Sequence, residues 1–483
     1  MNTEGFFAVE KKYNLYQLQV RNIYVWYYLR NQIWQNDICR QTFNMGIAQN
    51  SVSGFRRTKD YIKMITKSFH MSWKAEPAKV AVFCAPHRIL QNGKYKCPYT
   101  DDLISALPDC AAFENHLRYQ HLKPTVTENI NYTDSFFIKA RFQYYFEMTH
   151  QSKFRKIIGE CREALAEPLS EIASLYEINL DVEKYCRYAA TFVIYNPIMA
   201  SYFKKMLEPV HPKVIIEVCH FNNTNMLMNE VAGQLGIKTV ELMHGNLRAD
   251  TIAYSYASTS VPFGGIPDYL FTFSDYWTEL SRLPKNNVKV ISTGFHQFNE
   301  RRKRFKRCSD NSGKTTILFV SQGTIGSQLS RLAVEISKLI DMEKYEIIYK
   351  LHPGETPVWR EKYGWLKNSD IQVVTDSDKS IYDFFSISEF LIGVYSTTIY
   401  EAVGCGLKTF IYDIAFADEM ELLVKKGYAS FIRSAEDFVK YLNVDKKQVI
   451  EFPDRMSGLW KEDAICNMVN EIEHIINEMP ATV

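Results

Sequence analysis

The sequence predicts an α/β protein with two parallel β-sheets in two consecutive domains. Short apolar runs alternate with helix-like segments in both halves of the chain, which is typical of parallel sheets covered by helices. A polar and basic stretch, residues 300–313, separates the two series and is expected to be a linker. The chain has 483 residues, so each half is long enough to bury a core of its own.

The composition argues against a nucleic-acid-binding protein and against a disulfide-rich secreted protein. A formal net charge of +2 argues against nucleic acid as a partner, and 46% hydrophobic with 23% charged residues is ordinary for a globular protein. The ten cysteines stand singly, which favours a reducing cytosol over disulfides or a zinc site. The chain starts without the pattern of a signal peptide, and no apolar run approaches the ~20 residues that span a bilayer. We therefore expect a cytoplasmic protein, with a peripheral position on the inner face of the membrane as an alternative.

The first half opens with an aromatic-rich helical extension, residues 1–75. Its segment 24–34 would either pack on the first domain or form an acceptor-facing or membrane-facing surface. The first domain is expected at residues 76–299, with a polar loop across 86–102. Its expected strands are 79–85, 214–218, 238–243, 269–273 and 288–292.

The second half repeats the alternation after the basic linker. The run 301–307 would be either a solvated connection or a contact for anionic lipid head groups. The second domain is expected at residues 314–458, and a helix within 459–483 closes the chain. The expected strands of this domain are 316–320, 345–351, 371–375, 390–394 and 408–412.

Two strands of the second domain end in residues that suit a phosphate group. His352 and Pro353 follow the strand 345–351, and Ser396, Thr397 and Thr398 follow the strand 390–394 ahead of a helix. Free N–H groups and the dipole at a helix N-terminus attract anions. Because the carboxyl ends of parallel strands meet at one edge of a sheet, the sequence predicts a nucleotide monophosphate or diphosphate there.

Each of these residues has a structural alternative. His352 can donate to a phosphate oxygen of the leaving nucleotide, or it can bond only to nearby backbone. Pro353 would stiffen its loop. The hydroxyls of Ser396–Thr398 can bind phosphate or simply cap the helix. Gly323 and Thr324, after the strand 316–320, can bring main chain close to a phosphate or form a plain turn.

The order of these motifs resembles that of GT-B glycosyltransferases. Lys350-Leu351-His352-Pro353 precedes Ser396-Thr397-Thr398, then Glu401 and a strand, and the likeness is strongest over residues 210–425. The pattern is similar to bacterial capsule and lipopolysaccharide transferases, to sialyltransferases and to CDP-glycerol glycerophosphotransferases. The resemblance implies two Rossmann-like domains facing each other across a cleft, with the nucleotide on the C-terminal side.

The same resemblance implies several residue roles. Lys350 belongs to the phosphate motif, and Glu401 would accept the hydroxyls of the ribose. No cofactor or metal is expected, because GT-B enzymes generally work without a metal ion. An Asp-x-Asp pattern at 376–378 is discounted on this ground.

Two residues of the first domain are candidate bases for an acceptor hydroxyl. His244 stands in a His-Gly pair at the end of the strand 238–243, and an unperturbed histidine pKa of about 6.5 suits that task. The glycerophosphotransferases carry a His-Gly at a similar place, with the histidine as base. Asp102 is the rival, since Asp101-Asp102 echoes the paired acids of sialyltransferases, although Leu103 replaces their glycine. A strand-end histidine can equally be structural.

A further polar loop follows the strand 214–218. Its residues His220, Asn222 and Asn223 would contact the acceptor or the sugar, or else cap the next helix.

The pattern predicts an inverting, metal-independent glycosyltransferase. It would move a sugar from a nucleotide-sugar donor to a hydroxyl of a bacterial surface glycan, free or lipid-linked. An anionic membrane surface is a further candidate partner. Three alternatives stay open: a CDP-polyol phosphotransferase of teichoic-acid type, a nucleotide-sugar 2-epimerase and a non-enzymatic glycan-binding or scaffold protein.

Overall fold

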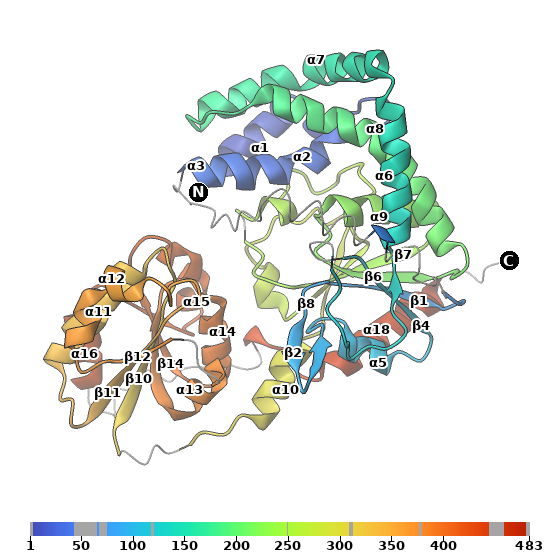
Figure 1. Ribbon diagram of the computed structural model, residues 1–483. Helices are drawn as coiled ribbons and strands as arrows, with labels where there is room; N and C mark the ends of the chain where they lie inside the picture. The colour runs from blue at the N-terminus through green and yellow to red at the C-terminus, as the bar shows by residue number, and fades with distance from the viewer. Residues whose placement is uncertain are drawn as a thin grey trace. The chain divides into compact units, whose positions relative to one another are not determined.

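A computed structural model describes most of the chain, in two compact units. The described residues are 3–42, 65–66, 75–116, 120–248, 250–308, 313–375, 379–443 and 458–479. One unit comprises Met1–His296 with Asp463–Val483, and the other comprises Gln297–Glu462 (Figure 1). We call them the N-terminal and the C-terminal domain.

The N-terminal domain is built on a parallel sheet of seven strands, in the order β5-β4-β1-β6-β7-β8-β9. Most of its strands are largely buried, as expected for strands that helices cover on both faces. The strands are β1 (Val80–Cys84), β4 (Cys110–Glu114), β5 (Asn131–Tyr132), β6 (Val214–Val218), β7 (Lys238–Leu242), β8 (Tyr269–Thr272) and β9 (Lys289–Ser292).

Helices cover both faces of this sheet, because alternate strand residues point to opposite sides. Val80 and Val82 pack on one side with α5 (Asp101–Ala106) and the closing helix α18 (Ala464–Glu478). Ala81 and Ile215 pack on the other side. The helices of that side are α1 (Thr3–Lys12), α2 (Val25–Ile33), α6 (Asp134–Met148), α7 (Gln151–Leu175), α8 (Val182–Leu207) and α9 (Asn223–Gln234), with the short elements η1 (Leu15–Gln17), η2 (Trp34–Cys39), α3 (Arg40–Thr42) and η3 (Ile252–Tyr254).

The described start of the N-terminal extension, residues 3–42, is a packed part of this domain. Trp26, Tyr27 and Tyr28 of α2 are buried. Arg30 forms a buried ion pair with Glu10, at 2.8 Å. The Arg30 guanidinium also donates to the carbonyl oxygens of Ile252 at 2.5 Å and Ser255 at 2.9 Å. Of the two interpretations of segment 24–34, the structure therefore has the packed helix.

A hairpin interrupts the polar loop expected across 86–102. Strands β2 (Ile89–Gln91) and β3 (Lys94–Lys96) pair antiparallel. Asn92 and Gly93 join them with φ of 50° and 75°. Two positive φ angles in an Asn-Gly pair are the mark of a two-residue hairpin turn.

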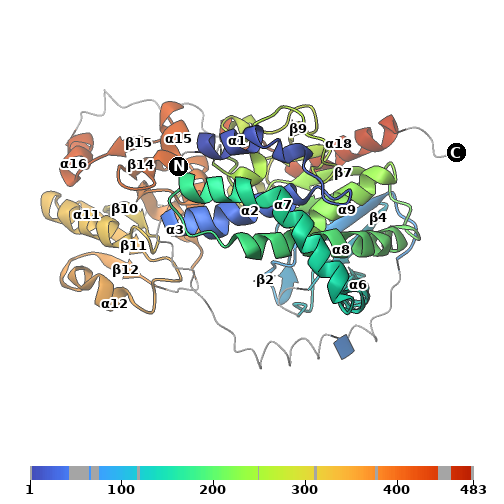
Figure 2. The ribbon, with the colours of Figure 1, turned by 90° about the horizontal axis from the view of Figure 1, so that it is seen from above.

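The C-terminal domain is built on a second parallel sheet, of six strands in the order β12-β11-β10-β13-β14-β15. Helices α11, α12 and α16 lie on one side of it, and α13 and α14 lie on the other (Figures 1 and 2). The strands are β10 (Thr315–Val320), β11 (Tyr345–Lys350), β12 (Gln372–Val374), β13 (Ser388–Gly393), β14 (Lys408–Tyr412) and β15 (Ser430–Ile432).

The remaining helical elements are η4 (Asp275–Thr278) in the N-terminal domain, α10 (His296–Arg304) at the boundary, and α11 (Gly326–Leu339), α12 (Trp359–Lys362), η5 (Gly364–Asn368), α13 (Ile381–Ile387), α14 (Thr397–Gly404), η6 (Ala417–Met420), α15 (Glu421–Lys425) and α16 (Ala435–Asn443) in the C-terminal domain.

The stretch 300–313, expected as a linker, is helical up to Arg304 within α10. Arg302 donates to the carbonyl oxygen of Gly404 at 3.1 Å, and Arg307 donates to those of Ser388 at 2.5 Å and Gly406 at 2.9 Å. Cations commonly satisfy the free carbonyl groups at a helix C-terminus. Part of the basic run therefore caps the end of α14 inside its own domain.

The predicted fold class is confirmed: the chain is α/β, with two Rossmann-like domains and an N-terminal helical extension, the domain composition of GT-B-like proteins. The cleft expected between the domains stays a prediction. In the described part of the chain, no helix has both the length and the apolar character needed to cross a bilayer.

Candidate functional site

Three neighbouring strands of the C-terminal domain bring the predicted phosphate residues to one sheet edge. β10 lies between β11 and β13, and all three run parallel. His352 follows β11, Gly323 and Thr324 follow β10, and Ser396 follows β13. Adjacent strands lie about 4.8 Å apart, so the flanking strand ends are separated by about 10 Å. The three loops could therefore contact one small anion.

A buried carboxylate connects two of these loops. Glu355 is 3% exposed. Its Oε2 accepts from the main-chain N–H of His352 at 2.8 Å, and its Oε1 accepts from the hydroxyls of Ser321 at 3.0 Å and Tyr363 at 2.7 Å. Tyr349 extends the network to Ser321 at 2.9 Å. Glu355 thus fixes the loops after β10 and β11 relative to each other.

The imidazole of His352 is oriented by its own loop. The main-chain N–H of Gly354 donates to Nδ1 of His352 at 3.1 Å, and the side chain is exposed. A neutral imidazole whose Nδ1 accepts a hydrogen bond carries its proton on Nε2. His352 therefore bonds nearby backbone, and in that neutral form it keeps an N–H donor. Its contact with a phosphate stays a prediction. Pro353, next to it, is exposed.

The third loop begins α14 in a capping arrangement. Ser396 is the N-cap, and its hydroxyl accepts from the main-chain N–H of Thr398 at 3.3 Å. Tyr395 contacts Thr324 of the neighbouring loop through their hydroxyl groups. Thr397, the first helical residue, is exposed. The loops after β10 and β13 are thereby joined as well.

Two predicted residues of this domain have partners away from the sheet edge. The Lys350 ammonium lies 5.7 Å from the ring of Phe384. Glu401 accepts from the hydroxyl of Tyr382, and Arg301 approaches it at 3.8 Å. Burial raises the pKa of Glu401, against the lowering effects of Tyr382 and Arg301. The assignment of Glu401 to a ribose stays a prediction.

The glycines after β10 differ in what surrounds them. A Cβ on Gly326 would stand 2.2 Å from Oε1 of Glu355 and 2.3 Å from the Tyr363 hydroxyl, whereas a Cβ on Gly323 would meet its nearest atom, in Glu355, at 3.8 Å. Packing inside the domain therefore requires a glycine at 326. It does not require one at 323, which leaves Gly323 free for close approach of a ligand.

In the N-terminal domain, His220 and Glu241 form a buried pair at the ends of β6 and β7. Nδ1 of His220 lies 2.7 Å from Oε2 of Glu241, and the main-chain N–H of His220 donates to Oε1 at 3.0 Å. The Tyr254 hydroxyl donates to the same Oε1 at 2.5 Å. Burial raises the pKa of Glu241, but His220 outweighs it and holds the pKa below its ordinary value. In the neutral ring, Nδ1–H donates to the carboxylate, and Nε2 then carries the lone pair.

His244 lies beside this pair. Its ring is 5.8 Å from that of Phe221, and burial lowers its pKa despite the nearby Glu241 carboxylate. Its Nδ1 is buried and has no hydrogen-bond partner within the described residues. His244 is thus neutral near pH 7 and lacks the carboxylate partner that orients His220.

A second buried carboxylate faces the pair from the same sheet. Glu217 of β6 lies opposite Glu241 of β7 in the strand register. Burial, with Glu241 as a nearby like charge, raises the pKa of Glu217 well above its ordinary range. Asn229 donates to Glu217 at 2.7 Å. A neutral Glu217 leaves the negative charge of this region on Glu241.

The other predicted residues of the N-terminal domain have local partners. Asp102 pairs with Lys96 at 2.7 Å and lies 3.3 Å from Nε2 of His296. Asn222 caps α9 by accepting from the main-chain N–H of Asn225 at 2.8 Å. Asn223 is the half-buried first residue of that helix. Their roles with acceptor or sugar stay predictions.

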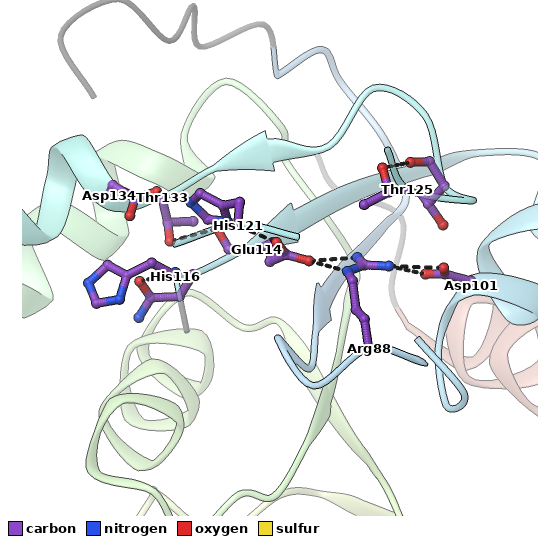
Figure 3. A network of polar contacts seen from close by, with 10 residues as sticks. Arg88, Asp101, Glu114, His116, His121, Thr125, Thr133 and Asp134 are labelled. Carbon is purple, nitrogen blue, oxygen red and sulfur yellow. Dashed lines mark hydrogen bonds and ion pairs between the residues drawn. The ribbon is translucent and has the colours of Figure 1, made fainter. Parts of the chain in front are cut away.

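A charged network at the ends of β1, β4 and β5 was not foreseen from the sequence. Arg88 forms ion pairs with Asp101 at 3.0 Å and with Glu114 at 2.6 Å, and all three side chains are buried (Figure 3). His121 lies between Glu114 at 2.9 Å and Asp134 at 2.8 Å. Burial disfavours the charge on His121, but the two carboxylates outweigh it and raise its pKa.

The sequence held signals for some of the missed residues. Glu217 stands inside an otherwise apolar strand, and Glu241 stands between Val240 and Leu242. A carboxylate is rarely buried without a partner. Glu355 stands in the same loop as His352. The Asp-x-Asp at 376–378 lies outside the described residues, and metal independence stays a prediction.

No family model and no curated protein matches this chain. Solved structures that resemble it include UDP-GlcNAc 2-epimerase from Methanocaldococcus jannaschii, 11% identical over 82% of this chain and 99% of that one, with a TM-score of 0.47. UDP-GlcNAc 2-epimerase from Neisseria meningitidis, bound to UDP-GlcNAc, is 12% identical over 82% and 98%, with a TM-score of 0.44. The wall teichoic acid polymerase TagF is 13% identical over 88% and 99%, with a TM-score of 0.40. Likenesses at this level carry no inference about residues or reaction.

Proposed function

We propose that this protein is an enzyme that acts on a nucleotide-linked sugar, and specifically a glycosyltransferase that moves the sugar to a hydroxyl of a bacterial surface glycan. One observation carries the proposal: His352, Thr324 and Ser396 follow three adjacent parallel strands of one Rossmann-like domain. Anionic ligands of such sheets bind beyond the carboxyl ends of the strands.

The leaving phosphate would be stabilised by the groups at this edge. Nε2–H of His352 donates a hydrogen bond to an oxygen of the phosphate, and the N-terminus of α14 contributes main-chain N–H groups and its dipole. Glu355 holds the His352 main chain, so this donor is positioned before the ligand arrives. The hydroxyls of Ser396 and Thr398 are the remaining candidate donors.

Within the N-terminal domain, His220 is the residue best equipped to act as the base. Its Nδ1 is oriented by a buried carboxylate, and this arrangement both fixes the tautomer and stabilises the imidazolium that forms. The acceptor oxygen bonds to the anomeric carbon while the bond from that carbon to the phosphate breaks. The hydroxyl proton passes to Nε2 of His220, and the electron pair passes to the phosphate oxygen.

The two bases expected from the sequence are less well equipped. His244 lacks a carboxylate at Nδ1 within the described residues, and Asp102 is occupied by Lys96 and His296. His244 keeps a role beside the base, because a neutral imidazole can donate to or accept from an acceptor hydroxyl.

Release of the nucleotide from a panel of nucleotide sugars and CDP-glycerol tests the proposal. We expect one nucleotide sugar to turn over, and His352→Ala and His220→Asn each to lower kcat by about 10²-fold or more. His474→Ala, at an exposed histidine of α18, is the matched control and should turn over normally. Normal turnover in both site variants would remove the mechanism. Preference for CDP-glycerol would replace glycosyl transfer by polyol-phosphate transfer. Conversion of the nucleotide sugar without any acceptor and without net release of the nucleotide would indicate an epimerase.

A further inference from the structure

Three large aromatic side chains lie exposed on one face of α6. Phe142 is 55% exposed, Tyr145 is 51% exposed and Phe146 is 67% exposed. Their spacing of three and four residues places them side by side on the helix. Helices of globular proteins normally turn such residues inward.

The opposite face of α6 is the one that packs on the domain. The Tyr144 hydroxyl lies 3.5 Å from Oγ1 of Thr191 on α8, and its ring lies 5.9 Å from that of Tyr195. α6 lies along the edge of the domain and meets α7 at a sharp turn (Figure 1). The exposed aromatic face is therefore additional to the face that the fold uses.

Basic side chains surround these aromatic residues. Between positions 139 and 156 the chain carries five basic residues and one acidic residue, Glu147, which pairs with Lys153 at 2.8 Å. The basic residues, all exposed, are Lys139, Arg141, Lys153, Arg155 and Lys156. The surface has a net charge of four, 5 − 1, without His150.

We propose that this surface, the aromatic face of α6 with the basic start of α7, docks the protein on an anionic lipid bilayer. Aromatic rings flanked by lysine and arginine suit the boundary between head groups and acyl chains. The basic side chains complement the negative potential of anionic lipids.

Charge complementarity favours a lipid surface over other occupants. A second copy docked through the same face would bring two sets of positive charges together, which is unfavourable in a symmetric interface. A neutral glycan could stack on the rings, but it has no negative charge to complement the five basic residues. Segment 24–34 is largely buried in its domain. In the run 301–307, Arg302 and Arg307 donate to main-chain carbonyl groups of their own domain.

The surface is tested by flotation of the whole chain with phosphatidylcholine vesicles, with and without phosphatidylglycerol. We expect binding to the anionic vesicles only, with an affinity that falls as salt rises. Phe142→Ser with Phe146→Ser, and separately Lys153→Glu with Arg155→Glu and Lys156→Glu, should each weaken it by about tenfold or more. All five positions are exposed, so these variants should keep the wild-type melting temperature.

Matched controls change equally exposed residues elsewhere. Leu339→Ser, at a leucine 48% exposed, and the triple change Lys338→Glu, Lys425→Glu and Lys440→Glu should leave vesicle binding unchanged. The proposal is overturned by absence of binding to anionic vesicles, or by binding that the surface variants retain. A dimer in sedimentation that these variants abolish, without vesicle binding, would overturn it in favour of a second copy. Nucleotide turnover is scored separately, because the surface does not depend on the proposed reaction.

Discussion

Oε2 of Glu355 accepts a hydrogen bond from the main-chain N–H of His352 at 2.8 Å, while Oε1 of the same carboxylate accepts from Ser321 and Tyr363. The residue that would face the leaving phosphate is thus held by a carboxylate buried behind it.

Replacing Glu355 by Gln tests that support. The amide keeps the size of the side chain but makes neutral hydrogen bonds, which contribute less than charge-assisted ones. We expect the free energy of unfolding to fall by about 1–3 kcal/mol in urea titrations. Nucleotide binding should weaken as well, because the His352 loop loses its fixed position. Wild-type stability with wild-type affinity would contradict the role given to Glu355.

Gly326→Ala should destabilise the same hydrogen-bond network by crowding Glu355 and Tyr363. The added Cβ would stand 2.2 Å from Glu355 Oε1 and 2.3 Å from the Tyr363 hydroxyl, so both must move. Overpacking of this kind costs about 1–3 kcal/mol, measured by thermal unfolding. Gly364→Ala is the control, because no atom lies within 4 Å of a Cβ there. Equal losses of stability in the two variants would show that the clash with Glu355 and Tyr363 does not cause the loss.

Glu241→Gln should lower the rate while leaving the donor's KM nearly unchanged. Gln can still hold His220 in place, but it cannot stabilise the imidazolium that forms when the proton is taken. We expect kcat to fall by about 10²- to 10⁴-fold. His244→Gln should lower kcat less than Glu241→Gln, since His244 has no carboxylate at Nδ1 within the described part of the chain. The reverse order would make His244 the base.

The contribution of His121 to stability should depend on pH. The charged imidazole donates to both Glu114 and Asp134, whereas the neutral ring has a single N–H (Figure 3). Its pKa is raised in the folded protein, so the stabilisation is fully present below the unfolded value of about 6.5 and is lost as pH rises through the folded value. The difference in unfolding free energy between wild type and His121→Gln should shrink with rising pH. His474→Gln, at an exposed site, should show little change.

Much of the fold could be predicted because it depends on local pattern. Continuous apolar runs gave most strands of both sheets, and parallel topology placed His352 and Ser396 at one edge. β4 was not predicted, because its sequence Cys-Ala-Ala-Phe-Glu is short and has no β-branched residue. The hairpin around Asn92-Gly93 could not be predicted, because its two strands are short and lie in a polar segment that has the composition of a loop.

The partners of individual side chains could not be predicted, because they come from segments distant in the chain. Glu401 has the residue type expected for a ribose contact, but Tyr382 and Arg301 already bind it. Arg302 and Arg307 looked like solvated linker residues and instead cap α14. The His220–Glu241 pair joins residues 21 positions apart through neighbouring strands.

Calorimetric titration of the whole protein with CMP, CDP, UDP and GDP tests the central claim most directly. The account predicts that one of these nucleotides binds, and that His352→Ala and Ser396→Ala each weaken it by about tenfold or more while the control His474→Ala does not. Absence of binding to all four, or equal affinity in wild type and both site variants, would contradict a phosphate site at the ends of β10, β11 and β13.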